Sequence, residues 1–189
     1  MLYIRLGDIA RIRLSVIMQE RMRRQKELTK WLTAANFQAD NVITGEPTYL
    51  DYFPDDDCLI SAGDIIIKRI SPTYVNYIDD IEPQIYAGNN LAIVTPNPNY
   101  YPKYVAMLLS EHILEISTRT SIGSVLKSIG KLDLESWEFP IRGYEQQVLV
   151  GNYWYDNIKL KKLRKRLIEL EYIKEHNRIK NYVIMTKGD

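Results

Sequence analysis

The apolar positions near the start of the chain follow the two-residue period of a β-strand. Residues 10–16 alternate between apolar and polar side chains, which predicts a strand. Asp8 stands just before this stretch and is expected to cap a short helical turn. Residues 19–28 are charged and weakly amphipathic, so we expect a loop or a short exposed helix there.

The middle of the chain has the pattern of several strands separated by turns. Residues 58–61 and 65–70 form the clearest pair, with a turn around Gly63, and the three consecutive isoleucines of the second run are typical of a buried strand. Residues 74–81 alternate as a strand does, and a further single strand is expected over 84–94.

The last third of the chain changes to helical spacing. Residues 104–117 carry an apolar helix face with Pro102 near its first turn, and 118–124 form a polar segment that predicts a loop. A final group of apolar residues is expected to close the domain core: Leu132, Leu134, Trp137 and Phe139. Helical periodicity then continues after Gly143, with Gly151 as an interruption.

Four leucines in this last segment have the spacing of a coiled-coil seam. Their intervals are 3, 4 and 3 residues, as for the a and d positions of heptads: Leu160, Leu163, Leu167 and Leu170. A helix over 144–185 would be roughly 60 Å long, whereas a domain over 1–143 would have a radius of roughly 16 Å. We therefore expect a compact domain over 1–143, a helix over 144–185 that pairs with another helix, and a short tail over 186–189.

Charged residues are distributed unevenly along the chain. The net charge of the 189 residues is +1, but residues 1–158 hold 15 Lys and Arg against 20 Asp and Glu, and residues 159–189 hold 10 against 4. A second basic cluster lies near the N-terminus: Arg21, Arg23, Arg24, Lys26 and Lys30. Tyrosine occurs 14 times, which suits either strands or a surface that binds protein or nucleic acid. Both interpretations stay open.

Cysteine content and hydropathy narrow the class of protein. The single cysteine, Cys58, excludes a disulfide framework and a cysteine metal site, and its apolar neighbours predict a buried side chain. An apolar run of about 18 residues, the length that predicts a membrane span, does not occur in the sequence, and the first residues do not resemble a secretory signal. We therefore expect a cytoplasmic protein that contacts no membrane.

Several short motifs follow one another in a recognisable order. They are Leu6-Gly7-Asp8-Ile9-Ala10-Arg11-Ile12-Arg13, Ser61-Ala62-Gly63-Asp64-Ile65-Ile66-Ile67, Asn90-Leu91-Ala92-Ile93-Val94, Tyr101-Pro102-Lys103-Tyr104-Val105, Gly123-Ser124-Val125-Leu126-Lys127-Ser128-Ile129, the segment 132–140, and Tyr144-Glu145-Gln146-Gln147. In this order and spacing the chain resembles one target-recognition half of the DNA-specificity subunit of type I restriction–modification systems. Members of that family carry two such domains and two such helices, whereas this chain has one of each.

The resemblance implies both a fold and a function. The implied fold is α+β, a target-recognition domain with a curved sheet, followed by a long C-terminal helix that forms a coiled coil. The implied function is recognition of one half of a split sequence in double-stranded DNA, together with docking of a DNA methyltransferase (modification) subunit. Because spacer helices of this family pair antiparallel, the implied assembly is a homodimer or a pair with a second half-subunit. Catalysis is expected from the partner subunits, and no cofactor is expected for this chain.

Three groups of residues are candidates for DNA contact under this resemblance, because cations and hydroxyls on loops beside rigid strands suit phosphates and base edges. The first group follows the isoleucine run: Lys68, Arg69, Ser71 and Tyr74. The second lies in and after the polar segment: Ser121, Ser124 and Lys127. The third is the pair Arg11 and Arg13. An ordinary solvated or salt-bridged surface remains the alternative for each group.

Other chemistry has weaker support in the sequence. Asn97-Pro98-Asn99-Tyr100 is similar to an amino-methyltransferase motif, but its third position differs and a proline-rich turn is the better interpretation. The acidic residues at 55–57 with Asp64 are expected to be solvated rather than nuclease ligands, and His112 and His176 are isolated. Two rival functions stay open: a protein–protein adaptor of the same fold, and an enzyme.

Overall fold

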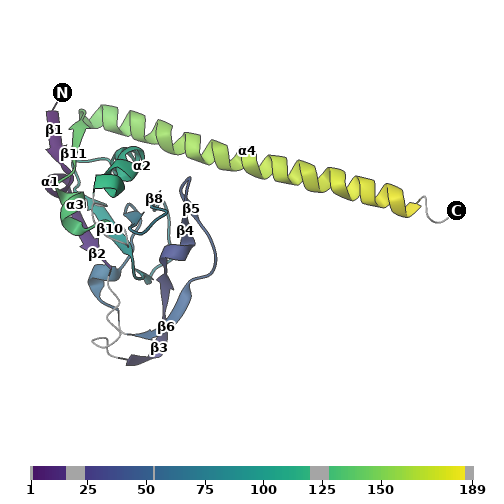
Figure 1. Ribbon diagram of the computed structural model, residues 1–189, viewed down its shortest axis with the longest axis horizontal. Coiled ribbons are helices and arrows are strands. Elements are labelled where there is room, and N and C mark those ends of the chain that lie inside the picture. The colour runs from purple at the N-terminus through teal and green to yellow at the C-terminus, as the bar shows by residue number, and fades with distance from the viewer. Residues whose placement is uncertain (1, 16–23, 53, 120–127, 186–189) are drawn as a thin grey trace. The chain divides into compact units, whose positions relative to one another are not determined.

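The computed structural model describes residues 2–15, 24–52, 54–119 and 128–185 (Figure 1). It divides into two compact units, Met1–Trp154 and Tyr155–Asp189. The elements in chain order are β1 (Leu2–Arg5), α1 (Leu6–Ile9), β2 (Ala10–Leu14), β3 (Arg24–Leu32), η1 (Ala34–Asn36), β4 (Phe37–Gln38), β5 (Val42–Ile43), β6 (Thr48–Tyr52), η2 (Asp56–Cys58), β7 (Ile65–Lys68), β8 (Tyr74–Tyr77), β9 (Ile85–Ala87), β10 (Leu91–Pro96), α2 (Pro102–Arg119), α3 (Lys131–Glu135), β11 (Glu138–Ile141) and α4 (Tyr144–Met185).

A four-stranded antiparallel sheet in the order β2-β10-β7-β8 forms the centre of the first unit. The predicted isoleucine strand is confirmed as β7, whose Ile65, Ile66 and Ile67 are fully buried. A strand buried on both faces needs apolar side chains at every position, because successive side chains point to opposite faces. Helix α2 contacts β8 and β10, and the predicted helix with Pro102 in its first turn is confirmed.

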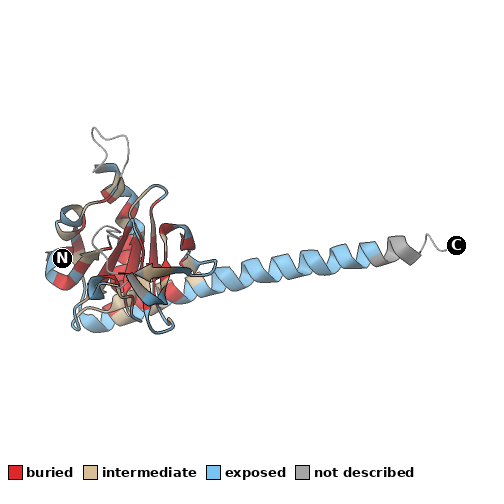
Figure 2. Cartoon of the chain, turned by 90° about the horizontal axis from the view of Figure 1, so that it is seen from below, coloured by how far each residue is buried: buried red, intermediate tan, exposed pale blue. Residues whose placement is uncertain are grey.

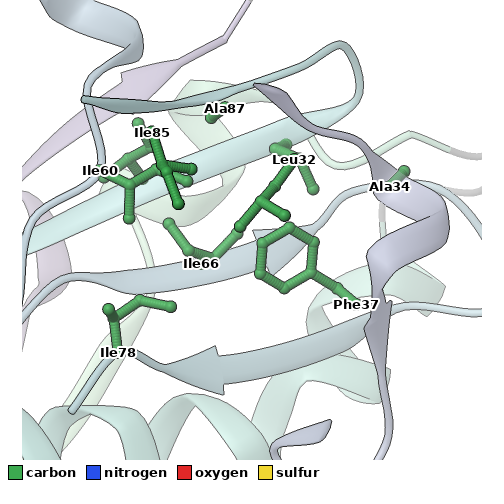
Figure 3. Close-up of a cluster of buried hydrophobic side chains, with 10 residues drawn as sticks. Leu32, Ala34, Phe37, Ile60, Ile66, Ile78, Ile85 and Ala87 are labelled. Carbon is green, nitrogen blue, oxygen red and sulfur yellow. The ribbon is translucent and has the colours of Figure 1, made fainter. Parts of the chain in front are cut away.

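The apolar core on the side of Ile66 joins this sheet to a second one (Figure 3). The second sheet has the order β6-β3-β9, and its β3–β9 pair is parallel. Leu32 from β3, Phe37 from β4, and Ile85 from β9 belong to the same buried cluster as Ile66. Two short pairs, β1-β11 and β4-β5, complete the described sheets.

Several local predictions fail because long-range pairing decides the structure. The described part of 19–28 is strand rather than loop or helix, since β3 pairs with β6 across an irregular register between Arg24 and Thr29. The single strand expected over 84–94 is two strands, β9 and β10, which belong to different sheets. Asp8 does not cap α1, because Arg5 occupies the N-cap position and Asp8 lies inside the first turn.

Most of the apolar residues predicted to close the domain core are buried in the structure. Leu134, Trp137 and Phe139 are buried, but the prediction for Leu132 is wrong because 79% of that residue is exposed. Thr118 belongs to α2 rather than to a loop, and residues 120–124 of the predicted loop lie outside the described residues. Cys58 is buried, as predicted.

The long C-terminal helix is confirmed as α4, and Gly151 does not interrupt it. Residues 144–154 of this helix belong to the first unit. Residues 159–180 are all exposed, as the pale blue helix shows in Figure 2. None of the helices in the described ranges is long and apolar enough to cross a membrane.

Candidate nucleic-acid interface

One end of the four-stranded sheet gathers most of the polar residues that follow the isoleucine strand. Leu91, the first residue of β10, pairs with Lys68, and Lys68 also pairs with Tyr74 of β8. The N–H of Ser15, just after β2, donates to the carbonyl of Leu91 at 3.1 Å. The strand ends therefore bring together a set of residues at one end of the sheet. We call this set the Lys68 end: Lys68, Arg69, Ser71, Tyr74, Asn89, Asn90 and Ser128.

Backbone hydrogen bonds join three loops at the Lys68 end. The Arg69 N–H donates to the Asn90 carbonyl at 2.9 Å, and the Ile129 N–H donates to the Arg69 carbonyl at 3.1 Å. An isolated bridge pairs Ile70 with Ser128. The β7–β8 loop, the β9–β10 turn and the segment before α3 therefore form a continuous surface.

Sequence reasoning missed three exposed members of this surface, Asn89, Asn90 and Ser128. The signal for the first two was the Gly88-Asn89-Asn90 run. Asn90 has a positive φ of 65°, a conformation that asparagine tolerates better than most residues and that marks a tight turn. For Ser128 no local signal exists, because its position depends on the bridge to Ile70.

The two cations of the Lys68 end have different contacts. The Lys68 Nζ lies 5.2 Å from the centre of the Tyr74 ring, within the range of a cation–π contact. The Arg69 Nε donates to the Ile129 carbonyl at 2.6 Å, and its terminal nitrogens make no hydrogen bond to another described residue. Burial lowers the pKa of the Arg69 guanidinium from its ordinary value, and the nearby Asp133 carboxylate partly opposes that shift.

Arg11 lies toward the opposite end of the same sheet. It pairs with Thr95, four positions along β10 from Leu91, which corresponds to about 13 Å along the strand. Its Nη2 forms an exposed ion pair with the Asp57 Oδ1 at 2.6 Å. The structure therefore does not bring Arg11 together with the Lys68 group.

Arg13 is held in the interior of the domain. Its side chain is 12% exposed, and its Nη2 lies 3.3 Å from the Oδ2 of Asp64, whose side chain is 2% exposed. The guanidinium also donates to the Thr95 hydroxyl at 3.1 Å and to the Leu59 carbonyl at 3.0 Å. The expectation that Asp64 is solvated is therefore wrong, because its side chain is buried. The DNA contact predicted for Arg13 stays a prediction, and the guanidinium is already held by three groups of the domain.

The remaining candidate DNA contacts, Ser121, Ser124 and Lys127, lie outside the described residues. Their neighbour Ser128 belongs to the Lys68 end.

Motifs considered for catalysis have ordinary structural surroundings. Asn97 lies in a turn, in which the Tyr100 N–H donates to the Asn97 carbonyl at 2.9 Å. The carboxylate of Asp55 accepts a hydrogen bond from the Asp57 N–H and caps η2. Within the described part of the chain, no three His, Cys, Asp or Glu residues are grouped so that they would hold a metal ion.

The predicted leucine seam lies on the exposed part of α4. The exposed fractions are 43% for Leu160, 68% for Leu163, 56% for Leu167 and 46% for Leu170. Exposure of four large apolar residues at heptad spacing is typical of a helix that pairs in a coiled coil.

Comparison with known proteins separates sequence similarity from similarity of fold. No protein-family model and no curated protein sequence matches the chain. Among solved structures, one chain from a study of complex assembly and conformational transition of a type I restriction–modification system has 18% identity and a TM-score of 0.63, and the match covers 94% of this chain and 43% of that one. The HsdS subunit from Thermoanaerobacter tengcongensis has 20% identity, a TM-score of 0.61, and coverage of 85% and 37%.

A third solved structure also matches the chain. The type I S subunit from M. genitalium has 15% identity and a TM-score of 0.59, with 92% of this chain and 43% of that chain covered. The chain has the fold of a type I S subunit. The predicted α+β class and long C-terminal helix agree with that fold. The chain spans less than half the length of each of these three structures.

Proposed function

We propose that this chain is a sequence-specific DNA-recognition module of a type I restriction–modification complex. In this role it reads one half of a split site and positions DNA methyltransferase subunits there, without catalysing bond formation itself. The S-subunit fold over most of the chain is the observation that carries the proposal. Because identity is only 15–20%, the specific contacts must be argued from this chain's own residues.

The Lys68 end is the proposed DNA-contacting surface. Its seven residues carry two cations, side-chain amides and hydroxyls, and none carries a carboxylate. Such groups donate to phosphate oxygens and to base edges. At the opposite end of the sheet, Arg11 faces Asp57, so its positive charge is already compensated. We therefore assign the main contact to the Lys68 end and a minor role at most to Arg11.

DNA binding is tested by fluorescence anisotropy with duplex DNA between about 50 and 200 mM salt. The wild-type chain is expected to bind, with an affinity that falls as salt rises because bound cations release counterions. Lys68→Ala is expected to weaken binding. Arg5→Ala serves as a control, because Arg5 is an exposed cation paired with Glu138 in a different sheet. Equal effects of the two substitutions would contradict the assignment.

The leucine seam is proposed to pair with the same seam of a second copy. A twofold dimer places two identical recognition domains on one DNA and prefers a palindromic split site. The 189 residues match less than half of each of the three S-subunit structures, and pairing of two copies supplies a second domain and a second helix.

Sedimentation velocity at micromolar concentration tests this pairing. The wild-type chain is expected to be a dimer, and Leu163→Glu with Leu167→Glu is expected to be a monomer, because charges on a heptad seam cannot be buried. Ile168→Glu is the matched control, since Ile168 is 66% exposed and directly follows Leu167 but lies off the seam. A monomeric wild type removes the basis for homodimerisation and leaves pairing with a different half-subunit.

A protein–protein adaptor of the same fold is the second candidate. The excess of five acidic residues over basic ones in residues 1–158 favours it. Absence of binding to random duplex at about 50 mM salt would support the adaptor, because phosphate contacts dominate non-specific binding at low salt.

A further inference from the structure

The first turns of α4 lie unusually close to the start of α2. A Cβ atom added at Gly151 would come within 2.6 Å of the Tyr104 backbone nitrogen, 3.0 Å of the Tyr101 ring and 3.1 Å of the Lys103 carbonyl carbon. Two of these atoms belong to backbone, so a side chain at residue 151 would force the two helices apart. Gly151 is therefore required for contact here, although the sequence pattern marked it as an interruption.

The side-chain amide of Gln147 forms two hydrogen bonds near the start of α4. Its Nε2 donates to the Arg142 carbonyl at 2.8 Å, and its Oε1 accepts from the Tyr101 N–H at 3.0 Å. The residue is only 2% exposed. The bond to Tyr101 joins the first turn of α4 to the start of α2, and the bond to Arg142 joins it to the segment that precedes α4.

A third contact comes from Asn152, which directly follows Gly151 in α4. The Asn152 Oδ1 accepts from the Tyr101 hydroxyl at 2.7 Å and from the Lys103 Nζ at 3.3 Å. The Tyr104 hydroxyl donates to the Pro140 carbonyl at 3.1 Å, which ties the start of α2 to the strand that precedes α4. We call the following residues the α4 seat: Gln147, Gly151 and Asn152 of α4, Tyr101 just before α2, and Lys103 and Tyr104 of α2.

We propose that Gln147 and Gly151 are positioning residues that hold residues 144–154 of α4 in one register on α2, and that this register determines which half-site spacing a pair of chains accepts. The second part rests on the proposed function. A slip of one residue moves a helix by about 1.5 Å along its axis. In a twofold pair the two ends together shift by about 3 Å, close to the roughly 3.4 Å rise of one base pair.

Electron spin–spin distances test the seat independently of DNA. Spin labels at Asp80 and Glu169, which are both exposed, report the distance between the first unit and the helix in doubly labelled chains diluted with unlabelled protein. Gly151→Ala and Gln147→Ala are expected to shift or broaden the distance distribution. Gly143→Ala and Gln146→Ala are expected to leave it unchanged, because a Cβ at Gly143 meets no atom within 4 Å and Gln146 is exposed. Unchanged distributions in both seat variants overturn the proposal.

Duplexes with two half-sites and a spacer of variable length test the second part. The seat variants are expected to move the preferred spacer by about one base pair or to accept several spacers equally. Their affinity for a single half-site is expected to stay within twofold of wild type. An unchanged spacer preference, with an altered distance distribution, overturns the link to spacing. If the wild type binds no split site, the proposed function fails, and the distance distributions alone decide whether the seat exists. Should Gly151→Ala fail to fold by circular dichroism, Gln147→Ala carries both tests.

Discussion

The two ends of the four-stranded sheet hold their cations in opposite chemical situations. At the Lys68 end, Lys68 lies against the Tyr74 ring and Arg69 donates to a backbone carbonyl. At the other end, Arg11 and Arg13 each form an ion pair, with Asp57 and Asp64 respectively. All four residues were candidates for DNA contact from the sequence. We therefore expect a cation on or beside a strand to contact DNA only when no carboxylate forms an ion pair with it.

Substitutions at the two ends of the sheet are expected to have different effects, on folding stability at one end and on DNA binding at the other. A buried ion pair is costly to break, because removal of one partner leaves an uncompensated charge. A cation over an aromatic ring at a surface contributes little to folding but remains available to a polyanion. Substitutions at the Arg13 end should therefore act on stability, and substitutions at the Lys68 end should act on DNA binding.

The largest expected effect comes from Asp64→Ala. The Asp64 carboxylate accepts from the Arg13 guanidinium, from the Thr95 hydroxyl and from the Ser61 N–H. Its removal leaves a buried guanidinium without its counter-charge, which is expected to lower the free energy of unfolding by about 3–5 kcal/mol. Urea denaturation followed by circular dichroism measures this change. A loss below about 1 kcal/mol would show that the pair behaves as a surface pair and would remove the contrast between the ends.

Lys68→Ala is expected to have an intermediate effect, on DNA affinity rather than on folding. Loss of one phosphate contact should weaken binding roughly uniformly across sequences and lower the slope of affinity against salt by about 1 on logarithmic axes. Anisotropy titrations at several salt concentrations give both quantities. An unchanged salt slope would mean that Lys68 makes no phosphate contact.

Arg11→Ala is expected to have the smallest effect. Its ion pair with Asp57 is exposed, and exposed pairs contribute roughly 0–1 kcal/mol to stability. DNA affinity should change by less than twofold, which sharpens the contrast with Lys68→Ala measured in the same titrations. A loss of affinity as large as that of Lys68→Ala would restore Arg11 as a DNA contact.

Elements that depend on local sequence patterns could be predicted from the sequence, whereas elements that depend on pairing between distant segments could not. The isoleucine strand, α2 and α4 were predictable, because burial on both faces and helical amphipathicity are local patterns. The strand β3 was not predictable, because its conformation depends on pairing with β6 and β9. A charged segment without strand alternation carries no local sign of that pairing.

The same distinction applies to the candidate site. Lys68, Arg69, Ser71 and Tyr74 were identifiable because they follow one strong strand. Asn90 and Ser128 join them only through bonds between distant segments, such as the Arg69–Asn90 hydrogen bond. The burial of Arg13 was likewise invisible, since Asp64 lies 51 residues away in sequence.

Enrichment of DNA from a random duplex library by the purified wild-type chain tests the central claim most directly. Sequencing of the bound fraction is expected to find two copies of one short motif in inverted orientation, separated by a spacer of fixed length. Lys68→Ala is expected to reduce the amount of bound DNA, and Leu163→Glu with Leu167→Glu is expected to abolish the fixed spacer length. A bound fraction with no enriched motif, or no bound fraction at about 50 mM salt, would contradict sequence-specific recognition and favour the adaptor.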